Sequence, residues 1–478
     1  MKTIQDTIKK PSRLTKSGKG NFYIESYGCQ MNFSDSEIVA SLMIDEGFSM
    51  THKPDDANII FLNTCAIREN AEQRVRTRLR ELQSLKNSNP DLVVGMLGCM
   101  AERLKESLLE QEKLVDLVAG PDAYRDLPKL VDQTLNGERS INVLLSMEET
   151  YADISPFRLS GNGISAFITI MRGCDNMCSF CVVPFTRGRE RSRSPESILQ
   201  ECQEAMERGY KEITLLGQNV DSYLWFGGGP KKDFQKQNPE VQKNAVRFSN
   251  LLQKVAQTFP KLRIRFTTSH PRDFTDDVLE IMASYPNICP YIHLPVQSGS
   301  TRILQIMNRG YSREWYLERI SAIRKHLPHA AISTDIIAGF CTETIQDHQD
   351  TLSLMKEVSF DYAYMFKYSE RPKTLAERRF QDDVPDGVKT ARLQQIIELQ
   401  QSLSHQSNQR DIGKIFEVLV EGPSKRSETK FCGRTPQNKM VVFNKTTGLE
   451  KGQYVHVEIT HSTSATLLGH VINTIPKS

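Results

Sequence analysis

Apolar runs of strand length alternate with longer helical patterns through the first 140 residues of the chain. The expected strands are residues 21–27, 57–63, 91–97 and 114–119. The helical patterns between them are residues 34–48, opened by a Ser/Asp cap, 66–86 and 101–112. Alternation at this spacing is typical of a parallel α/β sheet. We therefore predict an open parallel sheet as the N-terminal domain, residues 21–140.

A second series of alternating strands and helices begins after a polar connector, residues 141–163. Its six expected strands are residues 165–171, 212–216, 263–268, 291–295, 331–338 and 362–366. A closed barrel of this type has eight strand–helix units, so six units indicate an incomplete (β/α)6 barrel. We assign this central domain to residues 164–408, which end in a charged helical pattern.

The C-terminal residues 409–478 contain short β-like runs, at 415–421, 440–443, 454–459 and 466–470. Such runs predict a small all-β barrel. Lys and Arg outnumber Glu in this segment, so it is basic although the whole chain has a net charge of only +3. The expected fold class is therefore α/β, with an all-β domain at the C-terminus.

The bulk properties indicate a multidomain protein of the cytoplasm. A length of 478 residues exceeds what one hydrophobic core usually serves, so we expect two or three domains. No stretch approaches the roughly 20 apolar residues that a membrane helix needs, so we expect no membrane partner. Residues 1–20 are polar and basic, which favours a disordered arm over a secretion signal. In the cytoplasm the ten cysteines should stay reduced.

Three cysteines, Cys174, Cys178 and Cys181, follow the first strand of the predicted barrel with the spacing C-x3-C-x2-C. Thiolates are the ligands of iron–sulfur clusters, and three thiolates leave one iron of a cuboidal cluster open. The carboxyl ends of barrel strands are also where active sites of this architecture lie. The alternative is a zinc site completed by a distant His or Cys, although zinc motifs prefer paired C-x2-C hairpins. The spacing resembles the signature of the radical S-adenosylmethionine superfamily.

In that superfamily the open iron binds the amino and carboxylate groups of S-adenosylmethionine. One electron then cleaves the bound molecule to methionine and a 5′-deoxyadenosyl radical. The resemblance therefore implies a 4Fe-4S cluster and S-adenosylmethionine as cofactors.

Three isolated cysteines, Cys29, Cys65 and Cys99, each fall just after one of the first three predicted strands. Ligands of an open parallel sheet collect outside the carboxyl ends of its strands, so these three thiols can meet. Gly28 and Gly98, directly before two of them, would let the backbone turn closely around a cluster. The alternative is that all three are buried structural cysteines.

One cysteine per strand end, followed by a radical triplet and a basic β tail, resembles the methylthiotransferase family over residues 22–477. The matching N-terminal motifs are Tyr-Gly-Cys-Gln-Met-Asn at 27–32, Asn-Thr-Cys at 63–65 and Gly-Cys-Met-Ala at 98–101. The resemblance implies that Cys29, Cys65 and Cys99 hold a second, auxiliary 4Fe-4S cluster. It also implies that the C-terminal segment is an RNA-binding TRAM domain.

Four finer motifs indicate one branch of this family. They lie at residues 181–189, 216–223, 293–300 and 368–372. They are similar to the branch that converts N6-isopentenyladenosine next to the anticodon, adenosine 37 of tRNA, into its 2-methylthio derivative. Branches acting on threonylcarbamoyl-adenosine or on a ribosomal protein aspartate are the alternatives. A metal-stabilised RNA-binding protein without a reaction would be a different class altogether.

The resemblance also implies how the parts work together. The C2–H bond of adenine is too strong and too weakly acidic for a general base, whereas a primary carbon radical can attack it. A first S-adenosylmethionine methylates sulfur on the auxiliary cluster, and a second supplies the radical. The implied partners are the tRNA anticodon stem-loop and a reductant of the flavodoxin or ferredoxin type.

One segment departs from the family pattern. The family usually has Gly-Phe-Pro-Gly-Glu-Thr where this chain has Gly-Phe-Cys-Thr-Glu-Thr at residues 339–344. The changed pair, Cys341 and Thr342, alters a turn and places a cysteine near the barrel mouth.

Polar residues at the strand ends of the barrel are candidates for contact with the cofactor. They are Gln218 and Asn219 after the second strand, Gln297 and Ser298 after the fourth, and Asp335 in the fifth. Loop capping is the alternative for each of them.

Two groups of residues are candidates for RNA binding. Arginines crowd the stretch just after the cysteine triplet, at Arg187, Arg189, Arg191 and Arg193. They either form a solvated face or bind anticodon phosphates. In the C-terminal segment Phe431, Arg434 and Phe443 could stack on unpaired bases, and a core role for the two phenylalanines is the alternative.

Overall fold

The computed structural model describes residues 18–66, 69–159 and 163–474. The expected disordered arm, residues 1–20, lies almost entirely outside the described residues. The chain divides into two compact units, Met1–Leu144 with Ile154–Phe157, and Leu145–Asp153 with Arg158–Ser478. Among the described residues no helix is both long and apolar enough to span a bilayer.

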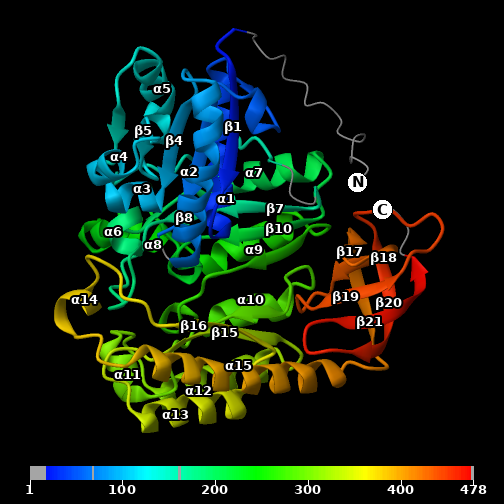
Figure 1. Cartoon of the computed structure of the whole chain (residues 1–478). Coiled ribbons are helices and arrows are strands. Elements are labelled where there is room, and N and C mark those ends of the chain that lie inside the picture. The colour runs from blue at the N-terminus through cyan, green and yellow to red at the C-terminus, as the bar shows by residue number, and fades with distance from the viewer. Residues whose placement is uncertain (1–17, 67–68, 160–162, 475–478) are drawn as a thin grey trace. The chain divides into compact units, whose positions relative to one another are not determined.

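The first unit contains a six-stranded sheet in which every pairing is parallel (Figure 1). The strands are β1 (Asn21–Ser26), β2 (Ser49–Met50), β3 (Ile59–Thr64), β4 (Val93–Gly98), β5 (Leu117–Ala119) and β6 (Ser140–Asn142), in the order β2-β1-β3-β4-β5-β6. β3 and β4 are buried along their whole length, as central strands of a parallel sheet are. The predicted open parallel sheet is confirmed, with two edge strands that are too short to show in the sequence.

The helices of this unit are α1 (Gln30–Asp45), α2 (Glu69–Ser88), α3 (Cys99–Leu104), α4 (Glu106–Gln111) and α5 (Leu127–Leu135). Two expected helices differ from the structure. α1 begins at Gln30 instead of Ser34: Cys29 is the N-cap residue, and the expected cap residues Ser34 and Asp35 are buried within the helix. The helix expected over 101–112 is broken at Lys105, whose φ of +52° interrupts the helical hydrogen-bond pattern.

The second unit contains the six expected barrel strands, arranged as two parallel three-stranded sheets. One sheet is β7 (Ser165–Thr169), β10 (Glu212–Leu216) and β13 (Arg263–Phe266); the other is β14 (Tyr291–His293), β15 (Ala331–Ala338) and β16 (Tyr362–Lys367). Ile264 of β13 also makes an isolated parallel bridge with Ile288, which lies just before β14. The prediction of an incomplete six-stranded barrel is confirmed.

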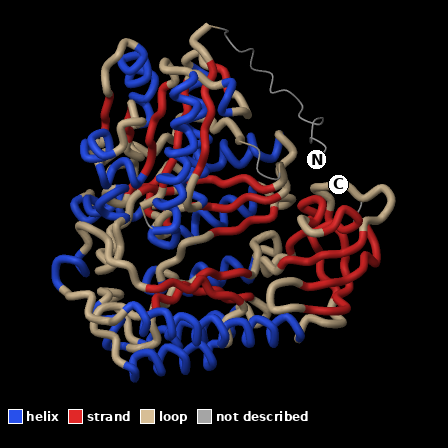
Figure 2. The backbone as a smooth tube through the Cα atoms, in the orientation of Figure 1, coloured by secondary structure: helices blue, strands red, loops and turns tan. Residues whose placement is uncertain are grey.

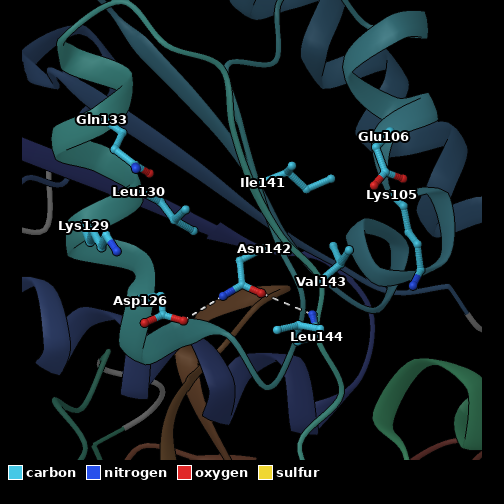
Figure 3. Close-up of a pocket in the computed structure, with 10 residues that line it drawn as sticks. All are labelled: Lys105, Glu106, Asp126, Lys129, Leu130, Gln133, Ile141, Asn142, Val143 and Leu144. Carbon is cyan, nitrogen blue, oxygen red and sulfur yellow. Dashed lines mark hydrogen bonds between the residues drawn. The ribbon is translucent and has the colours of Figure 1, made fainter.

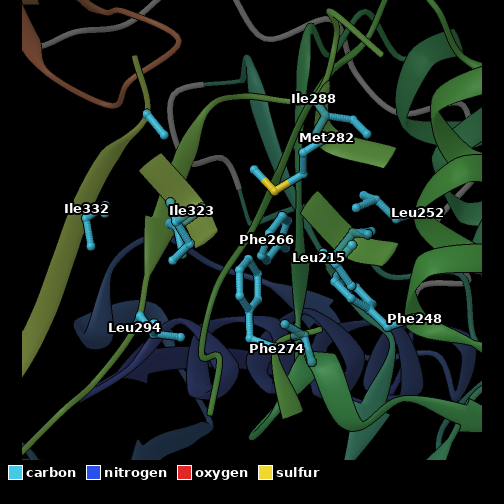
Figure 4. Packing of buried hydrophobic residues seen from close by; sticks show 14 of the residues in the cluster. Leu215, Phe248, Leu252, Phe266, Phe274, Met282, Ile288, Leu294, Ile323 and Ile332 are labelled. Carbon is cyan, nitrogen blue, oxygen red and sulfur yellow. The ribbon is translucent and has the colours of Figure 1, made fainter. Parts of the chain in front are cut away.

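Helices pack against these strands and form the largest core of the molecule (Figure 4). They are α7 (Pro195–Glu207), α9 (Phe248–Thr258), α10 (Asp276–Ser284), α12 (Arg313–His326), α13 (Ile345–Val358) and α15 (Asp386–Gln409). In Figure 4 strand residues such as Leu215 and Ile332 lie among helix residues such as Leu252 and Ile323. Burying each such side chain contributes roughly 1.5–3 kcal/mol.

Short elements complete the second unit around the barrel strands. They are β8 (Met171–Arg172), α6 (Val183–Arg187), β9 (Arg191–Ser192), β11 (Leu224–Trp225), α8 (Pro239–Asn244), β12 (Val246–Arg247), α11 (Thr301–Ile306) and α14 (Leu375–Arg379). β8 pairs with β9, which closes a loop containing Cys174, Cys178 and Cys181.

The C-terminal segment is a closed five-stranded barrel, as predicted. Its strands are β17 (Ile415–Ser424), β18 (Ser427–Arg434), β19 (Met440–Asn444), β20 (Tyr454–Ser462) and β21 (Leu467–Thr474), in the order β17-β18-β19-β21-β20. Figure 2 shows this segment as strands joined by loops. β18 was not expected, because its sequence SETKFCGR lacks an apolar run, yet the barrel closes only through it.

Candidate functional site

The carboxyl ends of β1, β3 and β4 bring Cys29, Cys65 and Cys99 to one edge of the first unit's sheet. These strands are neighbours, and in the parallel register Ser26 pairs with Asn63 and Asn63 with Leu97, so the strands end at the same level. Cys65 and Cys99 directly follow their strands, and Cys29 directly precedes α1. The chain visits β2 on one side of β1 and then β3 on the other, which makes this edge a topological switch point, where ligands of such sheets bind.

Two glycines allow the close approach of these cysteine turns. Gly28 has a φ of +116°, and a Cβ placed on it would lie 2.2 Å from Cys65 Cβ. Gly98 has a φ of +88°, and a Cβ there would lie 2.4 Å from Asn63 Oδ1. Any side chain at either position would push the strand ends apart, so the glycines are required for the grouping of the cysteines.

Buried amide side chains hold the turns below the cysteines. Asn63 Nδ2 donates to Asn32 O at 2.8 Å and to Ser36 Oγ at 3.0 Å, and Asn32 Nδ2 donates to Tyr27 O at 3.1 Å. Cys29 Sγ lies 3.6 Å from Asn32 Oδ1. Cys65 and Cys99 are buried and Cys29 is half-buried. This polar layer ties the β1 and β3 turns together and leaves Cys29 partly accessible.

The second cysteine triplet lies on one loop of the second unit. Cys174 and Cys178 are buried and Cys181 is half-buried. Burial, followed by the neighbouring Cys181 and Glu190, raises the pKa of Cys174 above its ordinary range. Cys178 acts on Cys174 in the same direction, so both other sulfur atoms lie within electrostatic reach of Cys174. A buried thiol of raised pKa is a poor nucleophile, whereas a bound metal ion would deprotonate it.

The loop is held firmly at its first turn. Gly173 has a φ of +78°, and a Cβ on it would lie 2.0 Å from Arg189 O. The Asp175 amide donates to Glu190 Oε1 at 3.2 Å, and the Glu190 amide donates back to Asp175 Oδ1 at 3.1 Å. These contacts fix the turn that carries Cys174.

In the described part of the chain no three His, Cys, Asp or Glu side chains converge as a ready-made site for one metal ion. A cuboidal cluster places each thiolate on a different iron, so its ligands surround a larger volume. No disulfide joins any of the ten cysteines, all of which are described.

Gln218 is the strand-end residue whose surroundings best fit a bound cofactor. Both polar atoms of its amide are buried, and neither has a hydrogen-bond partner among the described residues. A buried amide without a partner is costly, so a ligand that supplies one is expected at this position. The residues present therefore fit a cofactor with hydrogen-bonding groups at the end of β10.

The other strand-end candidates make hydrogen bonds within the protein. Asn219 Nδ2 donates to Asp273 Oδ2 at 2.6 Å, and Asn219 Oδ1 accepts from the His270 amide at 3.1 Å. Ser298 Oγ lies 3.3 Å from Thr351 Oγ1 and accepts from the Ser300 amide at 3.2 Å. These contacts match the loop-capping alternative for Asn219 and Ser298.

Gln297 and Asp335 meet at the carboxyl side of the second barrel sheet. The Gln297 amide donates to Asp335 O at 2.9 Å, with Gln297 at a φ of +73°. The half-buried Asp335 carboxylate lies 3.5 Å from His293 Nε2, and the His293 ring packs edge-on against Tyr364 at 5.6 Å. These side chains leave the Asp335 carboxylate partly open to solvent.

The expectation for the arginine stretch is wrong for three of its four members. Arg187, Arg191 and Arg193 are buried, so they form neither a solvated face nor a phosphate-binding surface. Arg191 Nη1 donates to the carbonyls of Arg187 and Arg189, and Arg193 Nη1 donates to Glu201 at 2.5 Å. Sequence periodicity did not reveal this because the segment packs back onto its own loop instead of running along a surface. Only Arg189 is substantially exposed, and it pairs with Asp175 at 3.1 Å.

In the C-terminal barrel Phe443 is a core residue, as the alternative for it stated. Phe431 pairs with Phe443 across β18 and β19, is half-buried, and lies 5.3 Å below the ammonium of Lys445. Arg434 keeps more than a third of its side chain exposed while it pairs with Glu421 at 3.1 Å. Arg434 and Phe431 are thus both partly accessible to solvent.

Sequence reasoning missed a polar network that ties the loop of Cys174, Cys178 and Cys181 to the strand ends. Asn176 Nδ2 and Asn219 Nδ2 both donate to Asp273 Oδ2, at 3.4 and 2.6 Å. Beside them burial, followed by Arg309 and Arg272, lowers the pKa of His270 to about 2, so its imidazole is neutral. The network joins residues far apart in sequence, and no local sequence pattern predicts it.

A cavity of about 450 Å³ lies in the first unit at the edge strand β6 (Figure 3). Asn142 bridges its wall by donating to Asp126 Oδ2 at 2.7 Å and accepting from the Leu144 amide at 3.2 Å. None of the six candidate cysteines lines it. Its Lys, Asp and Glu residues carry mixed charge and point to no ligand.

Comparison with known proteins accounts for nearly the whole chain. Residues 21–120 match the uncharacterised protein family UPF0004, residues 168–355 the Radical SAM superfamily, and residues 409–472 the TRAM domain. Relatives include the tRNA-2-methylthio-N(6)-dimethylallyladenosine synthase of Amoebophilus asiaticus, 60% identical over 94% of this chain and 92% of the relative. That of Christiangramia forsetii is 56% identical over 99% of both chains.

Solved structures share the fold at low sequence identity. The radical S-adenosylmethionine methyltransferase TsrM from Kitasatospora setae has a TM-score of 0.54 and 13% identity, covering 74% of this chain and 73% of that one. The cobalamin-dependent S-adenosylmethionine radical enzyme OxsB has a TM-score of 0.51 and 14% identity, covering 80% of this chain and 56% of that one. These likenesses show the fold alone.

Proposed function

This chain belongs to the family of tRNA-2-methylthio-N(6)-dimethylallyladenosine synthases, and from this membership we propose which of its residues perform each part of the reaction. It is a radical S-adenosylmethionine enzyme that attaches a methylthio group to N6-dimethylallyladenosine of tRNA, using 4Fe-4S clusters and S-adenosylmethionine. We further propose that the target base is adenosine 37, next to the anticodon.

Cys174, Cys178 and Cys181 would hold the radical cluster, and Cys29, Cys65 and Cys99 the auxiliary cluster. When bound, the first cluster with S-adenosylmethionine supplies a carbon radical able to attack the C2–H bond of adenine, and the second holds the sulfur. The observation that carries this assignment is that the β1, β3 and β4 strand ends, in register, bring three thiols to one sheet edge. Three structural cysteines without a common role would not be expected at the same edge of the sheet.

The chain's own residues prepare the site for these groups. The Gln218 amide would supply hydrogen bonds to S-adenosylmethionine, because its buried polar atoms are otherwise unpaired. Gln297 and Asp335 are proposed to face the same cofactor from the second barrel sheet, with Asp335 held by His293. Asn219 and Ser298 fix the loops that carry these residues.

The RNA surface is proposed to include Arg434 and Phe431 of the TRAM domain. Arg434 is exposed and positively charged, and Tyr364 on β16 lies within its electrostatic reach with 40% of its surface exposed. Exposed aromatic rings beside a guanidinium are suited to stacking unpaired bases of an anticodon loop. The electron donor would be a flavodoxin- or ferredoxin-type protein, and a tRNA substrate supports a location in the cytoplasm.

The function is tested by a nucleoside digest of tRNA from a deletion strain. The expected result is loss of 2-methylthio-N6-dimethylallyladenosine, restored by the wild-type gene and not by Cys174→Ala. The 2-methylthio form of threonylcarbamoyl-adenosine and the methylthiolated ribosomal aspartate should be unchanged. Loss of either of these instead would transfer the function to one of the alternative branches.

The cluster assignment is tested by iron and sulfide analysis of anaerobically reconstituted full-length protein. About eight irons per chain are expected, falling to about four in Cys29→Ala/Cys65→Ala/Cys99→Ala and in Cys174→Ala/Cys178→Ala/Cys181→Ala. Cys202→Ala/Cys289→Ala, which removes two buried cysteines outside both triplets, is the matched control and should keep about eight. A wild type with about four irons that the first triple variant retains would refute the auxiliary cluster.

A further inference from the structure

Arg309 is a buried cation that lies against the radical-cluster loop. It follows α11 in the turn Met307–Asn308–Arg309 and is only 5% exposed. Its Nη1 donates to Cys178 Sγ at 3.2 Å, its Nη2 to Pro295 O at 2.7 Å and its Nε to Tyr311 Oη at 3.0 Å. All three nitrogen atoms of the guanidinium are therefore engaged.

The buried charge of Arg309 is stabilised by a nearby anion, and the Cys178 sulfur, 3.2 Å from Nη1, would be that anion when it binds iron. Among the described residues no carboxylate lies within ion-pair distance of this guanidinium. A carbonyl and a hydroxyl accept hydrogen bonds but carry no net charge to balance a cation taken out of water. A cysteine bound to iron is a thiolate, and hydrogen bonds to a charged acceptor are stronger than neutral ones.

The turn that carries Arg309 also makes three hydrogen bonds with the loop that holds Cys174, Cys178 and Cys181. The Ser179 amide donates to Met307 O at 2.9 Å, and Ser179 Oγ donates to Ile306 O at 2.6 Å. Asn308, with a φ of +55°, donates from Nδ2 to Met177 O at 2.7 Å. These bonds flank Cys178 on both sides, so the guanidinium is held at the sulfur by the backbone as well as by its own contacts.

We propose that Arg309 is a positioning residue that sets the reduction potential of the cluster at Cys174, Cys178 and Cys181 through its hydrogen bond and charge at Cys178. This inference rests on the proposed function, which places a 4Fe-4S cluster there. Reduction adds one electron to the cluster, and a neighbouring cation stabilises the more negative, reduced form more than the oxidised form. Arg309 therefore raises the potential and makes reduction by the one-electron donor easier.

The test is an EPR-monitored redox titration of reconstituted full-length protein in the Cys29→Ala/Cys65→Ala/Cys99→Ala background, where only one cluster titrates. Arg309→Met removes the charge and keeps much of the bulk. Arg309→Lys keeps the charge and loses the fork geometry. Arg313→Met is the matched control, because it removes an arginine four residues away that pairs with Glu357 and the Asp350 carbonyl.

Arg309→Met should make reduction at least tenfold less favourable, which is a downward shift of about 59 mV for a one-electron couple. Arg309→Lys should shift the potential less, in the same direction, and Arg313→Met should leave it unchanged. An unshifted potential in Arg309→Met, or an equal shift in Arg313→Met, would overturn the proposal.

Three further outcomes separate this inference from the proposed function. If Arg309→Met retains no iron, Arg309→Lys decides: a potential equal to that of the background protein overturns the proposal, and a lower potential supports it. If the background protein itself binds no four-iron cluster, the cluster assignment fails and the role of Arg309 falls with it. A four-iron background with unshifted Arg309 variants leaves the proposed function intact and refutes only the role of Arg309.

Discussion

Individual residues at the cysteine turns show how little room this chain leaves around its thiols. Gly28 and Gly98 both adopt positive φ angles and both lie against backbone or side-chain atoms of β3 and the residues that follow it. Each position therefore requires glycine for two reasons: its φ angle is positive, and it has no room for a Cβ atom. Thr342 shows the opposite case, since a β-branched residue occupies a left-handed conformation at a φ of +64°.

Gly28→Ala is expected to disrupt the auxiliary cluster and leave the radical cluster in place. The new Cβ would lie 2.2 Å from Cys65 Cβ, so the two turns must separate. Iron content should fall from about eight to about four per chain. Gly137→Ala is the control for strain alone, since Gly137 also has a positive φ but a Cβ placed on it would meet no atom within 4 Å. Equal iron loss in both variants would contradict the steric argument.

Thr342→Gly is expected to stabilise the protein. A left-handed conformation costs a non-glycine residue about 1–2 kcal/mol, and the substitution by glycine removes this cost. About 0.5–1 kcal/mol of the gain is offset because glycine has more conformational freedom in the unfolded state. The net rise should appear as a higher thermal midpoint. Thr342→Val keeps the β-branch and the strain and should bring no such rise. A lower midpoint in Thr342→Gly would mean that the Arg302 contact to Thr342 Oγ1, at 3.1 Å, outweighs the strain.

At the scale of elements, helix α13 begins with a reciprocal cap. The Asp347 amide donates to Thr344 Oγ1 at 3.3 Å, and the Thr344 amide donates to Asp347 Oδ2 at 2.8 Å. Asp347 also accepts from Ser300 Oγ, which caps α11. One carboxylate thus joins the starts of two helices, one of which leads directly into the Arg309 turn.

Asp347→Asn is expected to lower the thermal midpoint at neutral pH and to lower it by less in acid. Burial acts to raise the pKa of Asp347. Hydrogen bonds from Arg302, Ser300 and Thr344 outweigh burial and hold this pKa below its usual range. A carboxylate with a lowered folded pKa stabilises the fold above its unfolded pKa of about 3.9, and this contribution is lost as the pH falls below that value. The midpoints of both proteins should differ by a constant amount from pH 7 to about pH 4 and converge as the pH falls further toward pH 2. A difference that stays constant below pH 4 would show that charge is not involved.

At the scale of the whole molecule, the TRAM barrel is joined to the partial barrel through buried arginines of β13. Arg265 Nη2 and Nη1 donate to Thr435 O at 2.8 Å and Pro436 O at 2.9 Å, and its Nε donates to Glu212 at 2.8 Å. Arg263 Nη1 donates to Arg434 O at 3.0 Å, and its guanidinium stacks over Tyr454 at 5.0 Å. The backbone of Arg434, whose side chain is a proposed RNA contact, is therefore held against the radical domain.

Arg265→Met is expected to loosen the TRAM barrel and to weaken tRNA binding. It leaves Glu212 buried without its cation, a change that costs about 3–5 kcal/mol. Proteolysis between α15 and β17 should become faster, and affinity for an anticodon stem-loop should fall. Glu212→Gln/Arg265→Met removes the unpaired charge and should recover stability without recovering the docking contacts. Unchanged proteolysis in both variants would refute the contribution of Arg265 to docking.

The sequence alone was sufficient for the fold class, an α/β chain with an all-β barrel at its C-terminus, and for the family, because these depend on local period and on spacing. The strand ends that carry Cys29, Cys65 and Cys99 follow directly from apolar runs, and the parallel register then has to bring them to one edge. Only the tertiary structure revealed the burial of Arg187, Arg191 and Arg193, the closure of the C-terminal barrel by β18, and the contact of Arg309 with Cys178. Each of these depends on which segment of distant sequence comes to lie against which. That pairing is decided by the packing of the whole chain, and the local sequence pattern does not indicate it.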